Sequence, residues 1–75
     1  MLLEKGADPN QFLHDGLIPL HRAANLGLSW AVQLLLDAGA DVNMASSSGK
    51  TALRYALQGG HTKIVNLLKD NGGTE

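Results

Sequence analysis

A five-residue segment of this chain returns after 33 positions, and this period constrains the fold more than any other feature. Residues 6–10 (GADPN) match residues 39–43 (GADVN), and the same offset pairs residues 34–35 (LL) with residues 67–68 (LL). The matches fall on glycines and on small or aliphatic residues, which are the positions that a stacked core constrains. A fixed period of this length is typical of repeat proteins, in which each unit buries its apolar side against its neighbours.

Each unit is predicted to contain two short helices separated by a glycine turn. In the second unit Thr51 can cap a helix that residues 59–60 (GG) end, because a left-handed residue after a helix is easiest as glycine. Thr62 is expected to cap a second helix, which residues 71–73 (NGG) end. The residues expected to face the core are Leu53, Ala56, Leu57, Ile64, Val65, Leu67 and Leu68.

The first unit repeats this pattern. Pro19 suits the first turn of a helix that Gly27 ends, and a second helix is predicted from residue 29 to about residue 38. Residues 6–17 and 39–50 are predicted loops, since Gly, Asn and Ser interrupt them. The core of this unit is expected to contain Leu20, Ala23, Ala24, Ala31, Val32, Leu34, Leu35 and Leu36.

Composition excludes several classes of protein. The 75 residues contain no cysteine, which excludes a disulfide-stapled domain, a thiol nucleophile and a cysteine zinc site. The net charge is -1 with the basic residues scattered along the chain, so neither nucleic acid nor a membrane is an expected partner. No apolar run approaches the roughly 20 residues of a membrane span. We therefore expect a soluble intracellular domain, in the cytoplasm or the nucleus.

The 33-residue period with its GADVN loop resembles the ankyrin repeat. Residues 18–24 (IPLHRAA) are similar to the Thr-Pro-Leu-His-Leu-Ala-Ala segment of that family, and residues 60–68 (GHTKIVNLL) to its Gly-His…Val-Val…Leu-Leu segment. The resemblance covers the whole chain. It implies an all-α solenoid of stacked antiparallel helix pairs joined by hairpin-like loops.

The resemblance also divides the chain. Residues 1–75 are expected to form one domain, with residues 1–5 as the end of a preceding outer helix, 6–38 as the first repeat, and 39–75 as the second repeat with a polar C-terminal cap. Residues 2–3 (LL) would then lack a neighbour on their N-terminal side, so self-association through this end is one expectation. The chain is interpreted as the C-terminal piece of a longer array, or as a protein that covers this end with a partner or a second copy.

Three departures from the family pattern concern the loops. Ile18 replaces a capping threonine, and Arg54 replaces the histidine that ties neighbouring loops together in the family. His21 keeps that histidine, so the resemblance implies a loop-to-loop hydrogen bond in the first repeat but not in the second. The usual loop aspartate is Leu13 in one repeat and Ser46 in the other, which predicts weaker tethering of both loop tips.

The sequence offers no convincing catalytic or cofactor site. Residues 48–51 (SGKT) resemble part of a phosphate loop, but Met44 stands where that motif needs glycine and no strand precedes it. His14, His21 and His61 form no pair on one helix turn, so no metal is expected. The serines at 46–48 have no oriented base, so the chain is predicted not to be an enzyme and to need no cofactor.

Binding of another protein is the function that we expect. Arg22, Asn25 and Leu26 are spaced i, i+3, i+4 opposite the buried stripe, and Tyr55 and Gln58 repeat that face. The resemblance implies that this face and the loop tips form the concave surface that contacts partners. The predicted contact residues are Phe12, His14, Asp15, Leu17, Arg22, Asn25, Leu26, Ser47, Lys50, Tyr55 and Gln58.

Alternatives stay open at this point. The chain could provide structural C-terminal capping repeats of a longer array, or a targeting or regulatory appendage of an enzyme domain outside this sequence. Phe12 and Leu17 could fold back onto the array rather than meet a partner. Trp30 could cover the turn beneath it or mark a second, convex contact. Asn43 resembles the asparagine that a dioxygenase hydroxylates in some ankyrin repeats, although a structural loop asparagine is the simpler interpretation.

Overall fold

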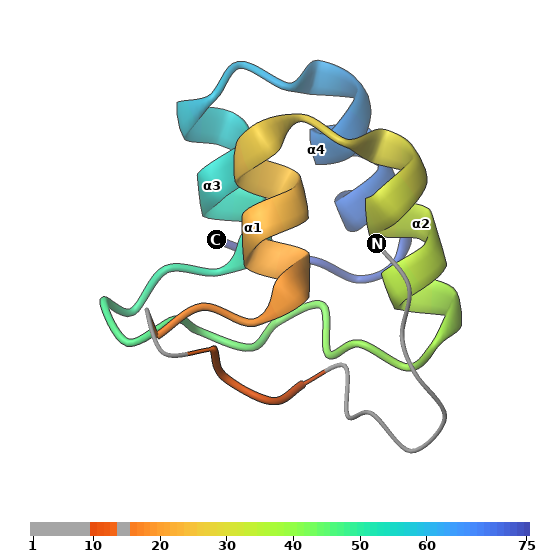
Figure 1. Ribbon diagram of the computed structural model, residues 1–75. Coiled ribbons are helices and arrows are strands. Elements are labelled where there is room, and N and C mark those ends of the chain that lie inside the picture. The colour runs from red at the N-terminus through yellow and green to blue at the C-terminus, as the bar shows by residue number, and fades with distance from the viewer. Residues whose placement is uncertain (1–9, 14–15) are drawn as a thin grey trace.

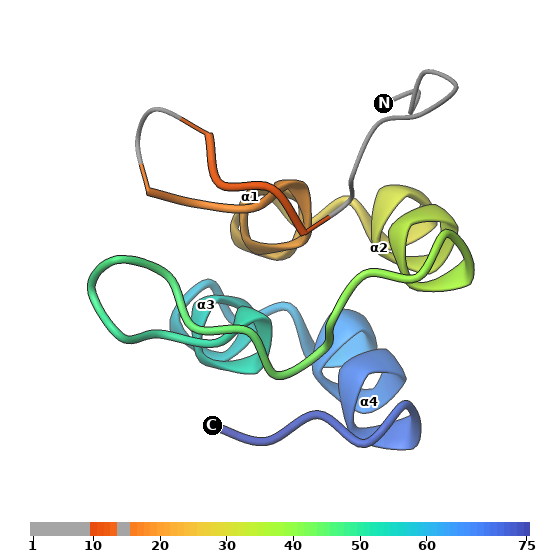
Figure 2. The same cartoon turned by 90° about the horizontal axis from the view of Figure 1, so that it is seen from below.

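The structure of the protein, a computed structural model, describes residues 10–13 and 16–75. Within these residues the chain forms four α-helices and no strand. The helices pair as two hairpins, and the pairs stack so that α1 lies beside α3 and α2 beside α4 (Figures 1 and 2). The predicted all-α stack of helix pairs is confirmed. The helices are α1 (Pro19–Leu26), α2 (Ser29–Asp37), α3 (Ala52–Gln58) and α4 (Thr62–Asp70).

Several predictions fall on residues outside this description. They concern the helix remnant at residues 1–5 with its two leucines, the start of the first loop at 6–9, and the contact residues His14 and Asp15. The division of the chain into repeats at residues 6–38 and 39–75 therefore stays a prediction.

The turn between α1 and α2 depends on Gly27. Pro19 begins α1 as predicted, and Gly27 ends the helix at a φ of 78°, in the left-handed region that favours glycine. The N–H of Leu28 then donates to the carbonyl of Ala23 at 3.0 Å. A Cβ atom on Gly27 would approach Cε1 of His61 to 2.7 Å. This turn therefore needs glycine for its backbone angle and for the close approach of the next repeat.

The second helix pair confirms one predicted cap and corrects another. The Oγ1 of Thr51 accepts a hydrogen bond from the N–H of Arg54 at 3.4 Å, as expected for an N-cap. Thr62 does not cap α4, since it is already the first helical residue and His61 occupies the cap position without a side-chain bond. The N–H of His61 closes the preceding turn by donating to the carbonyl of Ala56 at 2.9 Å. The cap of α4 is therefore His61, one residue before the threonine that the sequence predicted as the cap.

Small and aliphatic residues fill the core between the two helix pairs. Leu34 and Leu57 were predicted to face this core, but they are 50% and 42% exposed. In α2 the core side contains Ala31, Val32 and Leu35, so Leu34 points to one side of it. Leu36 and Leu67 are only partly buried. The buried apolar residues are Ile18, Leu20, Ala23, Ala24, Ala31, Val32, Leu35, Ala52, Leu53, Ala56, Ile64, Val65 and Leu68.

Equivalent asparagines connect successive loops. The Oδ1 of Asn10 accepts a hydrogen bond from the N–H of Asp41 at 2.5 Å, and its Nδ2 donates to the carbonyl of Gly39 at 3.3 Å. Asn43 makes the same two contacts 33 residues later, with the backbone of residues 74 and 72, at 2.8 and 3.1 Å. This pattern gives Asn43 a structural role in fixing the spacing between loops.

Candidate functional site

A buried histidine connects the N-terminal end of α1 to the loop before α3. We call α1 and α3 the inner helices, and α2 and α4 the outer helices. His21 is 0% exposed, and its Nδ1 accepts a hydrogen bond from the N–H of Ile18 at 3.2 Å. The proton of the neutral ring is therefore on Nε2, which donates to the carbonyl of Met44 at 2.6 Å. Burial lowers the pKa of His21 from 6.5, and the weaker opposing influence is the bond to Met44. The predicted loop-to-loop tie of His21 is confirmed.

Arg54, which stands at the equivalent position of the second repeat, makes no such tie. Its guanidinium is 53% exposed and lies 3.7 Å from the carboxylate of Glu75. Thr51 provides the connection instead, because its hydroxyl donates to the carbonyl of Thr74 at 2.7 Å. The predicted difference between the two repeats is thus present, and a threonine rather than the arginine links the last loop to the inner helix.

The second loop tip is better tethered than its sequence suggested. Ser46, in place of the usual aspartate, is buried, and its Oγ accepts hydrogen bonds from the hydroxyl of Tyr55 at 2.9 Å and the N–H of Lys50 at 3.3 Å. The N–H of Ser47 also donates to the carbonyl of Gly16 at 3.0 Å, which joins the two loop tips. The expectation of weak tethering is therefore wrong for this loop, because serine with a nearby tyrosine replaces the missing carboxylate.

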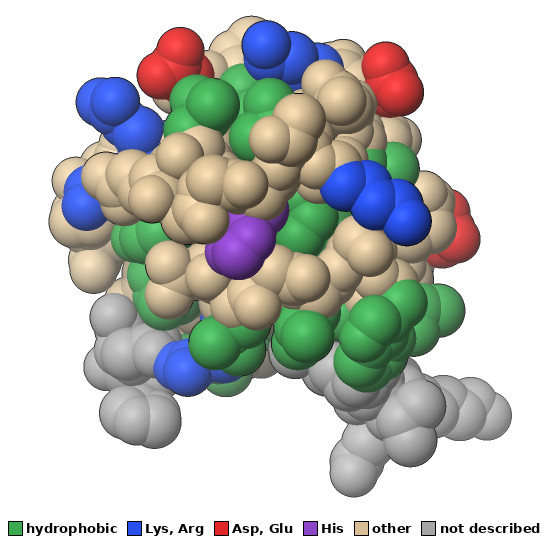
Figure 3. Space-filling model, turned by 90° about the horizontal axis from the view of Figure 1, so that it is seen from above, with side chains coloured by type: hydrophobic (Ala, Val, Ile, Leu, Met, Phe, Trp, Pro, Cys, Tyr) green, Lys and Arg blue, Asp and Glu red, His purple; other side chains and the backbone are tan. Residues whose placement is uncertain are grey.

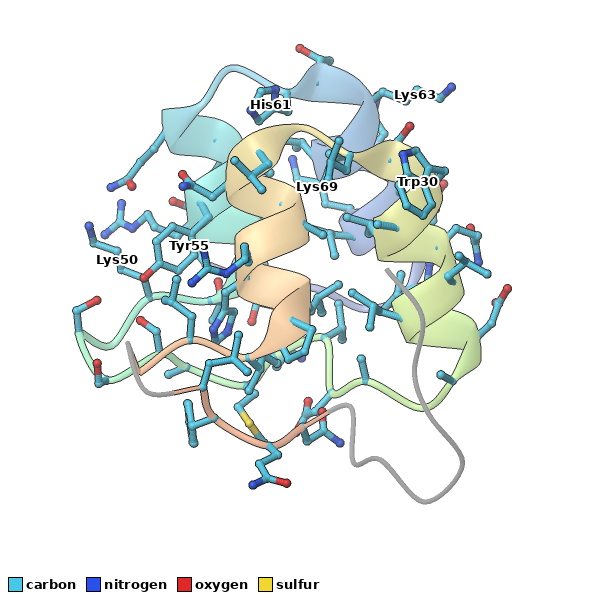
Figure 4. The ribbon with its side chains drawn as sticks, viewed as in Figure 1. Trp30, Lys50, Tyr55, His61, Lys63 and Lys69 are labelled. Carbon is cyan, nitrogen blue, oxygen red and sulfur yellow. The ribbon has the colours of Figure 1, made fainter. Side chains whose placement is uncertain are left out.

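Tyr55 lies at the centre of this arrangement. Its ring centroid is 5.6 Å from that of His21, and the Nζ of Lys50 lies 5.7 Å from the tyrosine centroid. Figure 4 shows Lys50 and Tyr55 together beside α3. The hydroxyl bond to Ser46 and the two ring contacts fix the orientation of this half-buried side chain. Tyr55 consequently offers a partner a pre-positioned aromatic edge.

The predicted contact residues that the structure describes share one side of the stack, which we call the inner face. It comprises the exposed and half-buried side chains of α1, of α3 and of residues 10–13, 16–17 and 44–50. α1 and α3 run side by side in the same direction (Figures 1 and 2), so Arg22 and Tyr55 occupy equivalent positions. The largest apolar exposures are those of Phe12 at 49% and Leu26 at 58%. Asn25, Ser47 and Gln58 are exposed, and Leu17, Arg22, Lys50 and Tyr55 are half-buried.

The opposite side of the stack contains a groove that the sequence reasoning missed. It lies between α2 and α4, has a volume of about 460 Å³, and has Trp30 at one end with 54% of its surface exposed. Figure 4 shows Trp30 on α2 and Lys63 on α4, and both side chains line the groove. The sequence signal that could have indicated the groove is the i, i+3, i+4, i+7 spacing of its four lining residues on α4, which places them on one side of that helix. The lining residues are Ser29, Trp30, Gln33, Lys63, Asn66, Leu67 and Asp70.

The end that carries both helix turns contains a half-buried imidazole, part of which is visible in Figure 3. This is His61, since His21 is buried, and its Nε2 lies 3.2 Å from the carbonyl oxygen of Asn25. Over residues 10–13 and 16–75, no group of three His, Cys, Asp or Glu side chains could coordinate a metal ion. None of the helices in that part of the chain is long and apolar enough to cross a membrane.

Comparison with known proteins agrees with this geometry. Residues 1–75 match a family model described as ankyrin repeats in three copies. Over 69 residues the chain is 42% identical to the ARF GTPase-activating protein Git of Drosophila melanogaster. The matched segment covers 91% of this chain and 9% of that protein. Over 54 residues it is 44% identical to Rabankyrin-5 of Mus musculus, covering 72% of this chain and 5% of that protein.

A third relative is similar to nearly the whole chain. Over 69 residues the chain is 40% identical to the inactive serine/threonine-protein kinase TEX14 of Bos taurus, covering 92% of this chain and 5% of that protein. The chain thus spans less than a tenth of the length of each of these three relatives.

Proposed function

Because the chain belongs to the ankyrin-repeat family, we propose that it is a non-catalytic module that binds a partner protein through its inner face. Ankyrin repeats generally mediate protein–protein interaction and are generally non-catalytic. The observation that carries the proposal is the pair of exposed apolar side chains, Phe12 and Leu26, on the same face as the fixed ring of Tyr55. A few buried anchor side chains, enriched in aromatic residues and arginine, carry most of the binding energy of protein interfaces.

Rigid presentation supplies the affinity in this proposal. The ring of Tyr55 is bonded before any partner arrives, and His21 and Ser46 already connect the loop at 44–50 to the inner helices. Ordering a flexible side chain on binding costs about 0.5–1.5 kcal/mol, so a side chain that is already fixed avoids that loss. The inner face therefore binds with little rearrangement of its second loop.

A capping role is the second candidate. It is supported by Lys69, which is exposed at the position that Leu36 occupies in the other helix pair. Leu57 on α3 opposes it, since this side chain is 42% exposed at the end of the stack that a cap would make polar. A targeting or regulatory appendage of an enzyme domain is a separate alternative, because the name of one relative describes an ARF GTPase-activating protein.

A pull-down from cell lysate, analysed by mass spectrometry, tests the proposal. The double variant Phe12→Ala/Leu26→Ala removes one aromatic and one leucine from the inner face. Its matched control, Trp30→Ala/Leu34→Ala, removes the same residue classes from the outer helix, where the exposures of 54% and 50% are similar. Both variants are first compared with the parent for helical circular dichroism and urea midpoint.

We expect the inner-face variant to lose a protein that the parent and the control retain. Equal retention by both variants would contradict binding through the inner face and favour the capping role. Loss in the control alone would move the binding site to the groove between α2 and α4.

A further inference from the structure

Among the described residues, acidic side chains are absent from the segments of the inner face. Residues 10–13, 16–26 and 44–58 contain three Lys or Arg residues and no Asp or Glu. Residues 27–43 and 59–75 contain two basic and four acidic residues. The described part of the inner face therefore carries an excess of positive charge, while the other described residues carry an excess of negative charge. Asp15 lies outside the described residues.

Lys50 is the cation that the structure positions most clearly. Its Nζ lies 5.7 Å from the centroid of Tyr55, which keeps the ammonium group at the surface of the inner face. In the part of the chain that the structure describes, no carboxylate pairs with it. Among the described residues, no ion pair therefore neutralises the charge of Lys50.

Close to Lys50 in the sequence lie a second cation, Arg54, and three residues with hydroxyl groups. Arg54, on the following helix, has only an exposed contact of 3.7 Å with Glu75, and such contacts are weak. The hydroxyls of Ser46, Ser48 and Tyr55 surround the same loop, with Ser48 Oγ 3.0 Å from Ser46 Oγ. The exposed Ser48 hydroxyl can rotate to donate to an incoming carboxylate, whereas the Tyr55 hydroxyl already donates to Ser46. No acidic residue occurs in α1, in α3 or in residues 44–50.

From this arrangement we propose that the inner face recognises an acidic segment of its partner protein. The carboxylates of that segment would lie around Lys50 and Tyr55, while its apolar residues contact Leu26 and Phe12. This inference rests on the proposed function and adds the chemical class of the partner. Complementary charge across an interface mainly sets specificity and the rate of association, so the chain would discriminate against basic and neutral segments.

The test is a selection of random 12-residue displayed peptides on the folded protein. We expect the enriched peptides to carry a net negative charge and at least one large apolar residue. For a synthetic peptide from the selection, Lys50→Glu should weaken binding about tenfold, because the substitution removes an attraction and introduces a repulsion. Raising the salt concentration from 50 to 500 mM should also weaken binding several-fold.

Lys63→Glu is the matched control, because it makes the same charge change on α4, away from the inner face. It should change the affinity less than about twofold. Enriched peptides that are neutral or basic, or equal effects of Lys50→Glu and Lys63→Glu, would overturn the inference. Tighter binding of a labelled single-stranded oligonucleotide than of the selected peptides would overturn it as well.

The same peptides separate failure of this inference from failure of the proposed function. Peptides that are not acidic but lose binding to the Phe12→Ala/Leu26→Ala variant would leave the inner face as the binding surface and remove only the acidic class. Peptides that bind this variant normally, or a selection that enriches none, would contradict the proposed function itself.

Discussion

Replacing His21 with alanine should remove a large part of the stability of the stack. The substitution leaves the N–H of Ile18, a residue with 0% exposure, without its acceptor at 3.2 Å. An unsatisfied buried donor costs about 1–3 kcal/mol. The carbonyl of Met44 is half-buried and loses its donor at 2.6 Å, which adds about 0.5–1.5 kcal/mol because water can partly replace that bond.

The expected loss in the free energy of unfolding is therefore about 2–4 kcal/mol. Marginal stability scales with length, and 75 residues correspond to a total of only about 4–11 kcal/mol. The variant should lose roughly a third to a half of that. Urea unfolding at pH 7.5, followed by circular dichroism and by the fluorescence of Trp30, measures the difference.

His61→Ala is the control, since the imidazole of His61 is only half-buried and has a single 3.2 Å contact with the carbonyl of Asn25. We expect it to cost about 0.5–1 kcal/mol. A loss below 1 kcal/mol for His21→Ala, or equal losses for the two variants, would refute the argument that His21 fixes the inner helices to the second loop.

Three further predictions test other contacts. Since burial lowers the pKa of His21 below 6.5, the unfolded chain binds more protons than the folded chain at mildly acidic pH. The contribution of neutral His21 to the free energy of unfolding is therefore complete above about pH 6.5 and declines below it. The urea midpoint should thus fall between pH 7.5 and 5.5, and His21→Gln should flatten that dependence; an unchanged slope would assign it to other groups. Asn43→Ala should cost about 1–2 kcal/mol and speed amide exchange at Thr74, because it removes the bonds at 2.8 and 3.1 Å; unchanged exchange would contradict the bridge. Gly27→Ala should lower the free energy of unfolding by about 1–3 kcal/mol, and by more than Gly39→Ala does. A Cβ added at residue 27 would lie 2.7 Å from the His61 ring, whereas a Cβ added at residue 39 would meet no atom within 4 Å. Equal urea midpoints for the two variants would show that the contact with His61 is unimportant.

The sequence predicted the helices well because a 33-residue period repeats the same local signals twice. Pro19 and Gly27 determine where α1 begins and ends through fixed backbone angles, and these effects are local. The start of α4 was misplaced by one residue because threonine is a common cap. There the closing bond from His61 to Ala56 decided the boundary.

Burial and loop tethering were harder to predict because they depend on neighbouring elements. Helix periodicity could not show that Leu34 lies beside the core rather than in it, since Leu34 and the buried Leu35 belong to the same apolar stripe. Ser46 lacks the carboxylate of the family pattern, and only the fold brings the hydroxyl of Tyr55 within 2.9 Å of it. For the candidate site, the sequence predicted the inner face but not the groove at Trp30, which needs two stacked helices to exist.

Nuclear magnetic resonance of the labelled protein, titrated with the partner recovered in the pull-down, tests the central claim most directly. Trp30 is the single tryptophan, so its indole N–H gives one resolved signal from the outer groove. Binding through the inner face predicts shifted amide signals in residues 16–26 and 44–58 and an unchanged indole signal. Shifts centred on the Trp30 indole and α4, with the signals of α1 and α3 unchanged, would contradict it.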